Sequence, residues 1–402
     1  MTPIAIKKLI VNKNMKHYNF DEVIERHGTS CVKFDRLKEM FGDENLIPLW
    51  VADMDFRTPD FIVEALKKRC EHEIFGYTFG SDEYYESIIN WVHYKHNWKI
   101  QREWISYIPG IVKGIAFAIQ CFTQKGDKVI IQPPVYHPFR IVPEKMKREV
   151  VYNPLKMVDG IYEMDFDHLE SIIDDECKVL ILCNPHNPGG IVWKKETLVR
   201  LADICAKHNI LVISDEIHAE MAYPQYTHYP FASVSDTASV TFMAPSKTFN
   251  IAGIVTSYAI VPNDRIREEF YSFLEAGEFG DGTIFAYTAT TAAYTYGAEW
   301  LQQMRMYIME NVRFVEEFMK QHLPKIKVYQ PQASFLVWLD CRELKLSQDE
   351  LVHLFKDKAG LALNDGSIFG PGGEGHMRLN IGCPRSVLDK AMNALKKAVD
   401  KK

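Results

Sequence analysis

Residues 178–190, KVLILCNPHNPGG, decide the kind of fold that this chain of 402 residues can adopt. The apolar run 179–183 ends in a polar turn that holds two Asn-Pro pairs and two glycines. The run is too short for a helix and does not alternate with polar residues, which is typical of a strand buried on both faces of a parallel sheet. The stretch therefore predicts a buried strand with a polar loop at its carboxyl end.

The same pattern recurs along the middle of the chain. Further apolar runs that end in polar or proline-bearing turns lie at residues 128–131, 210–214 and 240–243. Between two of the runs, residues 198–205 repeat apolar side chains at i, i+3, i+4 and i+7, which gives a helix one apolar face. This alternation of strand and helix predicts an open α/β sheet that is mostly parallel.

The pattern changes after about residue 290. A long helix is expected from about Thr291 to His322, followed by a strand at 334–339 and a final helix that carries Leu388 and Val399 on its apolar face. We therefore predict a large α/β/α domain and a smaller α+β domain that also takes in an N-terminal arm. The expected bounds are 60–290 for the large domain, 15–59 and 291–402 for the arm and the small domain, and 1–14 for a disordered extension.

Composition narrows the class of protein. The chain has 47 basic and 53 acidic side chains, so its formal net charge of −6 gives no electrostatic reason to bind nucleic acid or an anionic membrane. No apolar stretch reaches the length of a membrane span, and the N-terminus lacks the apolar core of a signal peptide. The eight cysteines include no Cys-x-x-Cys pair, so we expect free thiols, no metal site and a cytoplasmic protein.

Four strand ends carry polar residues of different chemistry. Tyr136 lies in QPPVYHP (132–138), Asn187 in the opening stretch, Asp215 in DEIH (215–218) and Lys247 in APSKTFN (244–250). Taken singly, they have ordinary structural readings: a partly buried aromatic, a turn residue, a helix cap and a surface lysine. Because ligands of open parallel sheets bind at the carboxyl ends of the strands, we expect the four to converge.

Together the four residues match the demands of one cofactor, pyridoxal 5'-phosphate (PLP). A pyridine ring stacks on an aromatic such as Tyr136, and its protonated nitrogen pairs with a carboxylate such as Asp215, so that the ring can act as an electron sink. The ring oxygen accepts from an amide such as Asn187, and the aldehyde reacts with a lysine such as Lys247. We therefore predict a PLP enzyme.

The phosphate of the cofactor also has a candidate site. Residues 109–114, PGIVKG, form a glycine-bearing turn that opens a helical pattern. The free backbone N–H groups of Ile111 and Val112, with the positive end of the helix dipole, suit an anion. The hydroxyl of Ser246, next to the lysine, adds a further donor.

Several of these stretches resemble fold-type I PLP enzymes, and more narrowly the MalY/PatB group of cystathionine β-lyases (C–S lyases). The stretches are WVADMDF (50–56), GYT (76–78), DEIH (215–218), SKTFNIAG (246–253) and RLNIGCPR (378–385). Two departures from the general aminotransferase pattern, Val255 in place of an arginine and His218 in place of a tyrosine, also occur in the lyase group. They favour the narrower assignment.

The resemblance implies a role for each candidate residue. Lys247 forms the Schiff base with PLP, and His218 lies near the ring oxygen. Arg378 binds the substrate carboxylate, for which its planar fork is suited. The further candidates for contact with a ligand are Ala52 and His137 toward the substrate, and Tyr77 toward the cofactor phosphate of a neighbouring subunit, which implies a homodimer. The Asn187–Pro188 peptide is expected to be cis, because tight turns favour such bonds.

The expected reaction is β-elimination from L-cystathionine, cysteine or a related amino acid with sulfur on Cβ, which yields pyruvate, ammonia and a thiol. The freed Lys247 acts as general base at Cα while Asp215 keeps the ring nitrogen protonated. An aminotransferase shares the early steps, so the residues leave that alternative open. A regulatory protein that binds a transcription factor is a further alternative, since some members of the group bind one. The loop 279–285, which contains two glycines, has no role assigned from sequence.

Overall fold

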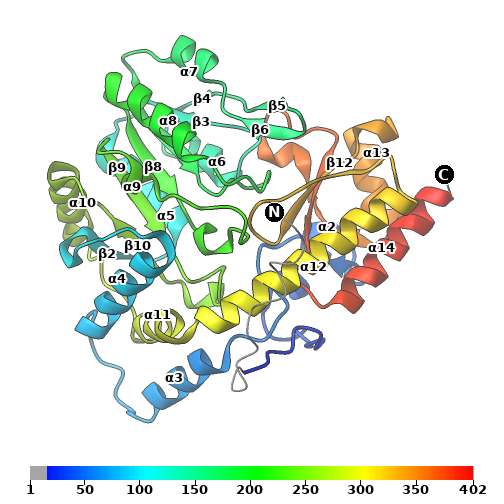
Figure 1. Ribbon diagram of the computed structural model, residues 1–402, viewed down its shortest axis with the longest axis horizontal. Coiled ribbons are helices and arrows are strands. Elements are labelled where there is room, and N and C mark those ends of the chain that lie inside the picture. The colour runs from blue at the N-terminus through cyan, green and yellow to red at the C-terminus, as the bar shows by residue number, and fades with distance from the viewer. Residues whose placement is uncertain (1–15, 402) are drawn as a thin grey trace.

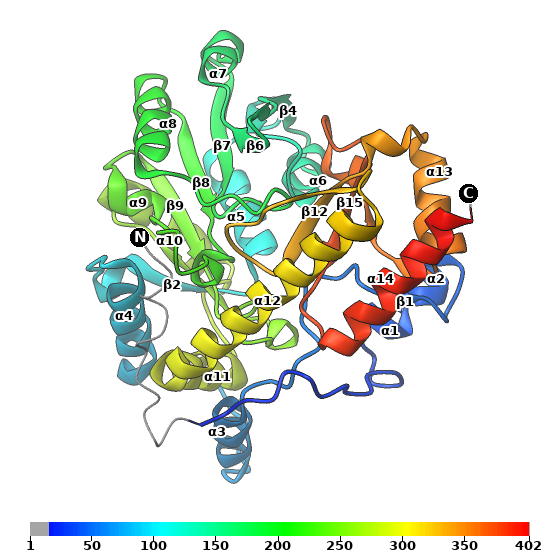
Figure 2. The same ribbon diagram turned by 45° about the vertical axis from the view of Figure 1, so that its right-hand side comes forward.

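The computed structural model describes residues 16–401, so the extension predicted at 1–14 lies outside the described residues. Figures 1 and 2 show a central sheet with helices on both faces, and beside it a smaller unit of strands and helices. The long helix α12 (Ala298–His322) runs from one part to the other. This arrangement agrees with the α/β fold and the second, smaller unit that the sequence predicts.

The central sheet has seven strands in the order β2-β10-β9-β8-β7-β3-β4. Their bounds are β2 (Ile105–Ile108), β3 (Lys128–Ile131), β4 (Glu149–Tyr152), β7 (Cys177–Cys183), β8 (Leu211–Asp215), β9 (Ser239–Met243) and β10 (Ser257–Ile260). The strands from β9 to β4 are parallel, whereas β10 is antiparallel to both of its neighbours. The four apolar runs predicted as strands are β3, β7, β8 and β9, which confirms the mostly parallel sheet.

Both faces of this sheet are buried, which explains why its strands read as unbroken apolar runs. In β7, Val179 and Ile181 pack into one core cluster, whereas Leu180 and Leu182 pack into the cluster on the opposite face. The helices of this part of the chain are α3 (Asp60–Cys70), α4 (Asp82–His96), α5 (Ile111–Phe122), α6 (Pro138–Lys145), α7 (Phe166–Ile172), α8 (Lys195–Lys207), α9 (Phe231–Val234), α10 (Asp264–Ala276) and α11 (Ile284–Tyr296).

The smaller unit is built around an antiparallel sheet in the order β11-β12-β15-β14. Its elements are β11 (Lys327–Tyr329), β12 (Leu336–Asp340), β14 (Asn364–Asp365), β15 (His376–Asn380), α13 (Gln348–His353) and α14 (Arg385–Asp400). The N-terminal segment joins it through β1 (Ile47–Pro48), which pairs in parallel with β13 (Leu361–Ala362). The remaining short elements are α1 (Val32–Asp35), α2 (Leu37–Phe41) and the β5 (Lys156–Val158) and β6 (Ile161–Glu163) hairpin, with 3₁₀ turns at Arg102–Trp104, Ala219–Met221, Ala252–Ile254, Arg342–Leu344 and Gly366–Phe369 and a π turn at Leu354–Lys358.

The single long helix predicted from Thr291 to His322 is wrong in one respect. The structure divides it at Gly297, where α11 ends and α12 begins in a different direction (Figure 1). A Cβ at this position would lie 2.2 Å from the carbonyl oxygen of Ala293 and 2.3 Å from the ring of Phe249. This close approach requires glycine, and sequence periodicity does not detect it because both helices continue an apolar pattern.

Three further observations concern membranes, thiols and metals. Within residues 16–401, every helix is too short or too polar to cross a lipid bilayer. All eight cysteines lie in this described range and are free thiols. The same range holds no group of three or more His, Cys, Asp or Glu side chains arranged to bind a metal ion.

Candidate active site

A cavity of about 190 Å³ lies at the carboxyl ends of β7, β8 and β9. Nine of the residues predicted from sequence line it: Ala52, Ile111, Val112, Tyr136, Asn187, Asp215, His218, Ser246 and Lys247. The sheet topology brings most of them together, because the carboxyl ends of parallel strands, and the loops that follow them, lie at one edge of the sheet.

Lys247 lies in the turn that follows β9. Hydrogen bonds from the Phe249 N–H to the Pro245 oxygen and from the Ile251 N–H to the Ser246 oxygen, each 2.9 Å, hold this turn. The Lys247 amine faces the cavity and donates to the carbonyl oxygen of Ala52 at 2.6 Å. Burial lowers the pKa of this amine, which favours the neutral, nucleophilic form.

Asp215 is the last residue of β8 and is 5% exposed. Its Oδ1 accepts a hydrogen bond from the Ile217 N–H at 3.1 Å. Burial raises the pKa of the Asp215 carboxyl to about 7, and the neighbouring Glu216 charge adds to this rise. A cation placed beside this carboxylate would be stabilised strongly, because the buried charge has little solvent to compensate it.

Asn187 and Arg378 form a buried pair beside the cavity. The Arg378 Nη1 donates to Asn187 Oδ1 at 3.1 Å, and its Nη2 donates to the Trp50 oxygen at 3.0 Å and to Asn364 Oδ1 at 2.6 Å. Because Asn187 uses its amide oxygen for Arg378, its amide NH₂ is the group left for a ligand. The Asn187–Pro188 peptide is cis, as the sequence predicts.

Arg378 carries a buried positive charge that has no acidic partner within residues 16–401. The side chain is 4% exposed, and burial lowers its pKa to about 10. Its guanidinium lies 5.0 Å from the ring of Phe369, and its Nε makes no hydrogen bond in the described part of the chain. A buried guanidinium of this kind favours an anionic ligand, above all a carboxylate.

The amino end of α5 presents unpaired backbone donors to the cavity. Gly110 precedes the helix with a φ of 102°, a conformation that favours glycine, and no side chain caps the helix. The Ile111 and Val112 backbones line the cavity there, together with Thr256 and Ser257. Free N–H groups at the positive end of a helix dipole form a suitable site for a phosphate.

His218 and Tyr136 complete the walls of the cavity. His218 is buried, its Nδ1 has no hydrogen-bond partner among the described residues, and burial lowers its pKa to about 3. It is therefore a neutral imidazole at physiological pH. The Tyr136 N–H donates to the Asn187 oxygen at 3.1 Å, which joins the loops after β3 and β7.

Three predicted residues do not line the cavity in this chain: Arg378, which lies beside it, His137 and Tyr77. His137 directly precedes α6, and its ring lies 5.1 Å from that of Tyr136 and 6.3 Å from that of Phe369, with a pKa lowered to about 4 by burial. Tyr77 lies on an irregular segment and is fully exposed. The loop 279–285 is irregular up to Thr283, and Phe279 stacks on Phe117 with ring centroids 4.4 Å apart.

Three contributors were missed by the sequence analysis. Thr256 and Ser257 line the cavity because β10 is antiparallel, so its amino end lies at the edge where the other strands have their carboxyl ends. Neither residue lies at the carboxyl end of a strand, so the rule used for the other strands does not identify them. Asn364 contacts Arg378 because β14 pairs with β15, and a strand of two residues has no periodicity that a sequence could reveal.

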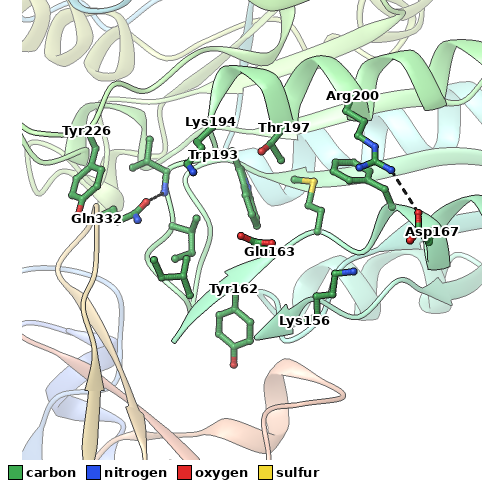
Figure 3. Close-up of a pocket in the computed structure, with 15 residues that line it drawn as sticks. Lys156, Tyr162, Glu163, Asp167, Trp193, Lys194, Thr197, Arg200, Tyr226 and Gln332 are labelled. Atoms are coloured by element: carbon green, nitrogen blue, oxygen red, sulfur yellow. Dashed lines mark hydrogen bonds and ion pairs between the residues drawn. The ribbon is translucent and has the colours of Figure 1, made fainter. Parts of the chain in front are cut away.

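A larger cavity, of about 360 Å³, lies between the β5–β6 hairpin and the start of α8 (Figure 3). Lys156 and Arg200 line it, but each has an acidic neighbour: Lys156 lies 3.2 Å from Asp165, and Arg200 lies 3.6 Å from Asp167. None of the predicted site residues takes part. We therefore assign the chemistry to the smaller cavity at the strand ends.

Comparison with known proteins agrees with this geometry. The chain is 44% identical to cystathionine beta-lyase PatB of Bacillus subtilis over 95% of this chain and 100% of PatB. It superposes with a TM-score of 0.92 on cystalysin of Treponema denticola, which contains a pyridoxal 5'-phosphate cofactor (35% identity, covering 96% and 100% of the two chains). The PLP-bound C–S lyase of Staphylococcus hominis gives a TM-score of 0.88 (34% identity, covering 95% and 98%). The family model described as aminotransferase class I and II matches residues 44–395, and the chain belongs to that family.

Proposed function

We propose that this chain is a PLP-dependent C–S β-lyase that cleaves L-cystathionine or a related amino acid with sulfur on Cβ. The observation that carries the proposal is one cavity lined by Lys247, Asp215, Tyr136 and Asn187, in a chain similar over nearly its whole length to C–S lyases. The products are pyruvate, ammonia and a thiol.

The donor set of the cavity fits PLP. Asp215 supplies a buried carboxylate for a protonated ring nitrogen, and Asn187 has an amide NH₂ to give to the ring oxygen. The amino end of α5 and Ser246 supply donors for the phosphate, and Lys247 supplies the amine that binds the aldehyde. When bound there, PLP supplies an electron sink that stabilises negative charge at the substrate Cα.

Arg378 binds and orients the substrate. Three of its five N–H groups hold Asn187, Trp50 and Asn364, so its guanidinium is fixed before a ligand arrives. The remaining N–H groups, including Nε, are free for the α-carboxylate. Binding the carboxylate compensates the buried charge of Arg378 and fixes the direction of the Cα–H bond.

Lys247 moves the proton. With PLP and substrate bound, the Lys247 Nζ would remove the proton from Cα, a role that requires the neutral amine favoured by burial. The Ala52 carbonyl oxygen, 2.6 Å from Nζ, holds the amine near the cavity. The neutral His218 imidazole adds no competing positive charge beside it.

A homodimer is part of the proposal. The exposed segment around Tyr77 also presents the apolar side chains of Ile74, Phe75 and Phe79 to solvent, and exposed apolar clusters of this kind mark protein interfaces. We propose that this segment contacts a second copy and places Tyr77 against the partner's cofactor phosphate. Tyr77→Phe should weaken PLP binding severalfold while the dimer persists in sedimentation; unchanged binding would contradict the contact.

We further propose that residues 60–290 bind the cofactor as a large domain, and that 15–59 and 291–402 form a smaller one that brings Arg378 to the substrate. The pairing of β1 with β13 supports this grouping. The free thiols of all eight cysteines support a reducing location such as the cytoplasm.

The test is product formation by the holoenzyme. Wild-type protein should release pyruvate and a thiol from L-cystathionine with no keto acid present, whereas an aminotransferase would require 2-oxoglutarate. Lys247→Ala should abolish both turnover and the absorbance of the lysine-bound cofactor, because no other amine lines the cavity in the described part of the chain. Turnover retained in this variant would refute the proposal.

A further inference from the structure

Four buried ionisable side chains form a row behind the strand end that carries Asp215. Glu216 Oε2 lies 2.8 Å from His228 Nε2, and Glu220 Oε2 lies 3.2 Å from His96 Nε2. The two imidazole rings meet edge to face with centroids 5.1 Å apart. All four side chains are nearly inaccessible to solvent, and none lines the cavity.

Glu216 is the most fully bonded member of the row. Ser214 Oγ and the Phe231 N–H both donate to its Oε1 at 2.8 Å, and His228 Nε2 lies within hydrogen-bond distance of its Oε2. An ionised carboxylate can only accept hydrogen bonds, and bonds to it are stronger than those between neutral groups. These contacts therefore hold the Glu216 carboxyl in one orientation.

Asp215 and Glu216 are consecutive residues at the end of β8, so their side chains leave the strand on opposite sides. The Asp215 oxygen accepts from the Asn184 N–H and the Glu216 N–H donates to the Phe242 oxygen, both at 2.9 Å. The backbone is thus held by both neighbouring strands while the Glu216 side chain is held from behind. The Asp215 side chain leaves the other side of the strand, where its carboxylate lines the cavity and accepts from the Ile217 N–H at 3.1 Å.

We propose that Glu216, held by His228, is the positioning residue of Asp215: it fixes the direction of that carboxylate and keeps a second negative charge behind it. The inference rests on the proposed function, in which Asp215 pairs with the ring nitrogen of PLP. A cationic ring nitrogen then meets the field of two buried carboxylates instead of one.

The other ionisable groups near Asp215 and Glu216 are distributed on both sides of the sheet edge. They are Lys247 and Arg378 beside the cavity, Tyr136 and Cys183 along its wall, Lys95 and His96 on α4, Glu220 after β8, Tyr258 on β10 and Arg305 on α12. Glu216 is the acidic group that raises the pKa of Asp215 beyond the effect of burial. Its charge is therefore the one to remove.

The experiment titrates cofactor-free protein with PLP across the neutral pH range and follows the absorbance of the lysine-bound form. In wild type the affinity should fall as the pH falls through about 7, because Asp215 then takes up a proton. Glu216→Gln keeps the shape but removes the charge, so the pKa of Asp215 drops. The midpoint should move to lower pH, and the affinity above the midpoint should fall roughly tenfold.

Glu220→Gln is the matched control, because it removes a buried charge at the far end of the same row. It should keep the wild-type midpoint and affinity, which separates the action of Glu216 from general damage to a buried network. His228→Asn loosens Glu216 but leaves its charge in place, so it should weaken PLP binding with a smaller shift of the midpoint than Glu216→Gln. This second variant keeps the test valid where Glu216→Gln does not fold.

A folded Glu216→Gln protein with the midpoint and affinity of wild type would overturn the inference. An equal shift in Glu220→Gln would overturn it as well, since the effect would then belong to the network and not to Glu216. Failure of the wild-type protein to give the absorbance of a lysine-bound cofactor would instead refute the proposed function. The two failures are therefore distinguishable.

Discussion

Replacing Arg378 by methionine should remove substrate binding without weakening the folded protein. The guanidinium is buried, lacks an acidic partner among residues 16–401 and has an unpaired Nε. Methionine fills similar space with an uncharged chain. We expect Arg378→Met to lower kcat/KM for L-cystathionine by roughly 100-fold, because about 3 kcal/mol of charge-assisted bonding to the carboxylate is lost.

In the cofactor-free protein, Arg378→Met has two opposing effects of similar size on the free energy of unfolding. Burial lowers the pKa of Arg378 from 12.5 to about 10, which corresponds to an electrostatic cost of about 3 kcal/mol for the charged form. The substitution removes that cost but also removes the three hydrogen bonds to Asn187, Trp50 and Asn364, at about 1 kcal/mol each. The thermal midpoint should therefore change by no more than about 3 °C.

The assay pairs two substrates that differ only in the carboxylate. Pyruvate and hydrogen sulfide release from L-cysteine should fall sharply in Arg378→Met, whereas the rate of proton loss from cysteamine, which lacks the carboxylate, should be nearly unchanged. Calorimetry of both cofactor-free proteins measures the stability. An equal loss on both compounds, or a thermal midpoint lower by ten degrees or more, would refute the reasoning, since Arg378 would then serve the fold.

Two further predictions concern Asp215 and Asn250. Because the folded-state pKa of Asp215 is raised to about 7, its contribution to stability is present below about pH 4 and is lost as the pH rises to about 7. Asp215→Asn should therefore unfold at a higher temperature than wild type at pH 8 without cofactor, yet bind PLP at least tenfold more weakly; a lower unfolding temperature would contradict this. Asn250→Ala loses three hydrogen bonds to the Met54 and Phe56 backbones and strains a residue at φ 54°, so unfolding should require about 3 kcal/mol less, measured by urea denaturation with Asn250→Gly as the less strained control.

Much of the site could be predicted because the carboxyl ends of parallel strands lie at the same edge of the sheet, even when they are far apart in the sequence. Asp215 ends a strand, and Asn187 and Lys247 lie in the turns after strands, so identifying the strands was enough to bring them to one edge. The amino end of α5 was readable for a similar reason, since a glycine before an apolar helical pattern marks a helix start. These features depend on local pattern and on one rule of topology.

The features that escaped prediction depend on non-local contacts. The contribution of Ser257 requires knowing that β10 runs against its neighbours, which no local pattern states. The break at Gly297 follows from the ring of Phe249, almost fifty positions earlier in the chain. The contact between Glu216 and His228 joins the two ends of a loop, and the sequence does not show where that loop lies in the fold.

Lys247, Arg378 and Asp215 carry charges that burial makes costly in free energy. The same burial makes the site selective for its ligand. Burial lowers the pKa of Lys247 and Arg378 and raises that of Asp215, so each charge is unfavourable in the ligand-free protein. Within the described residues none of them has an ion-pair partner closer than 4 Å. Only a ligand with a cationic ring beside Asp215 and a carboxylate beside Arg378 compensates both charges, so such a ligand gains affinity that a neutral molecule of the same size cannot. The buried charges that are costly in the empty protein are therefore the ones that select an amino acid on PLP.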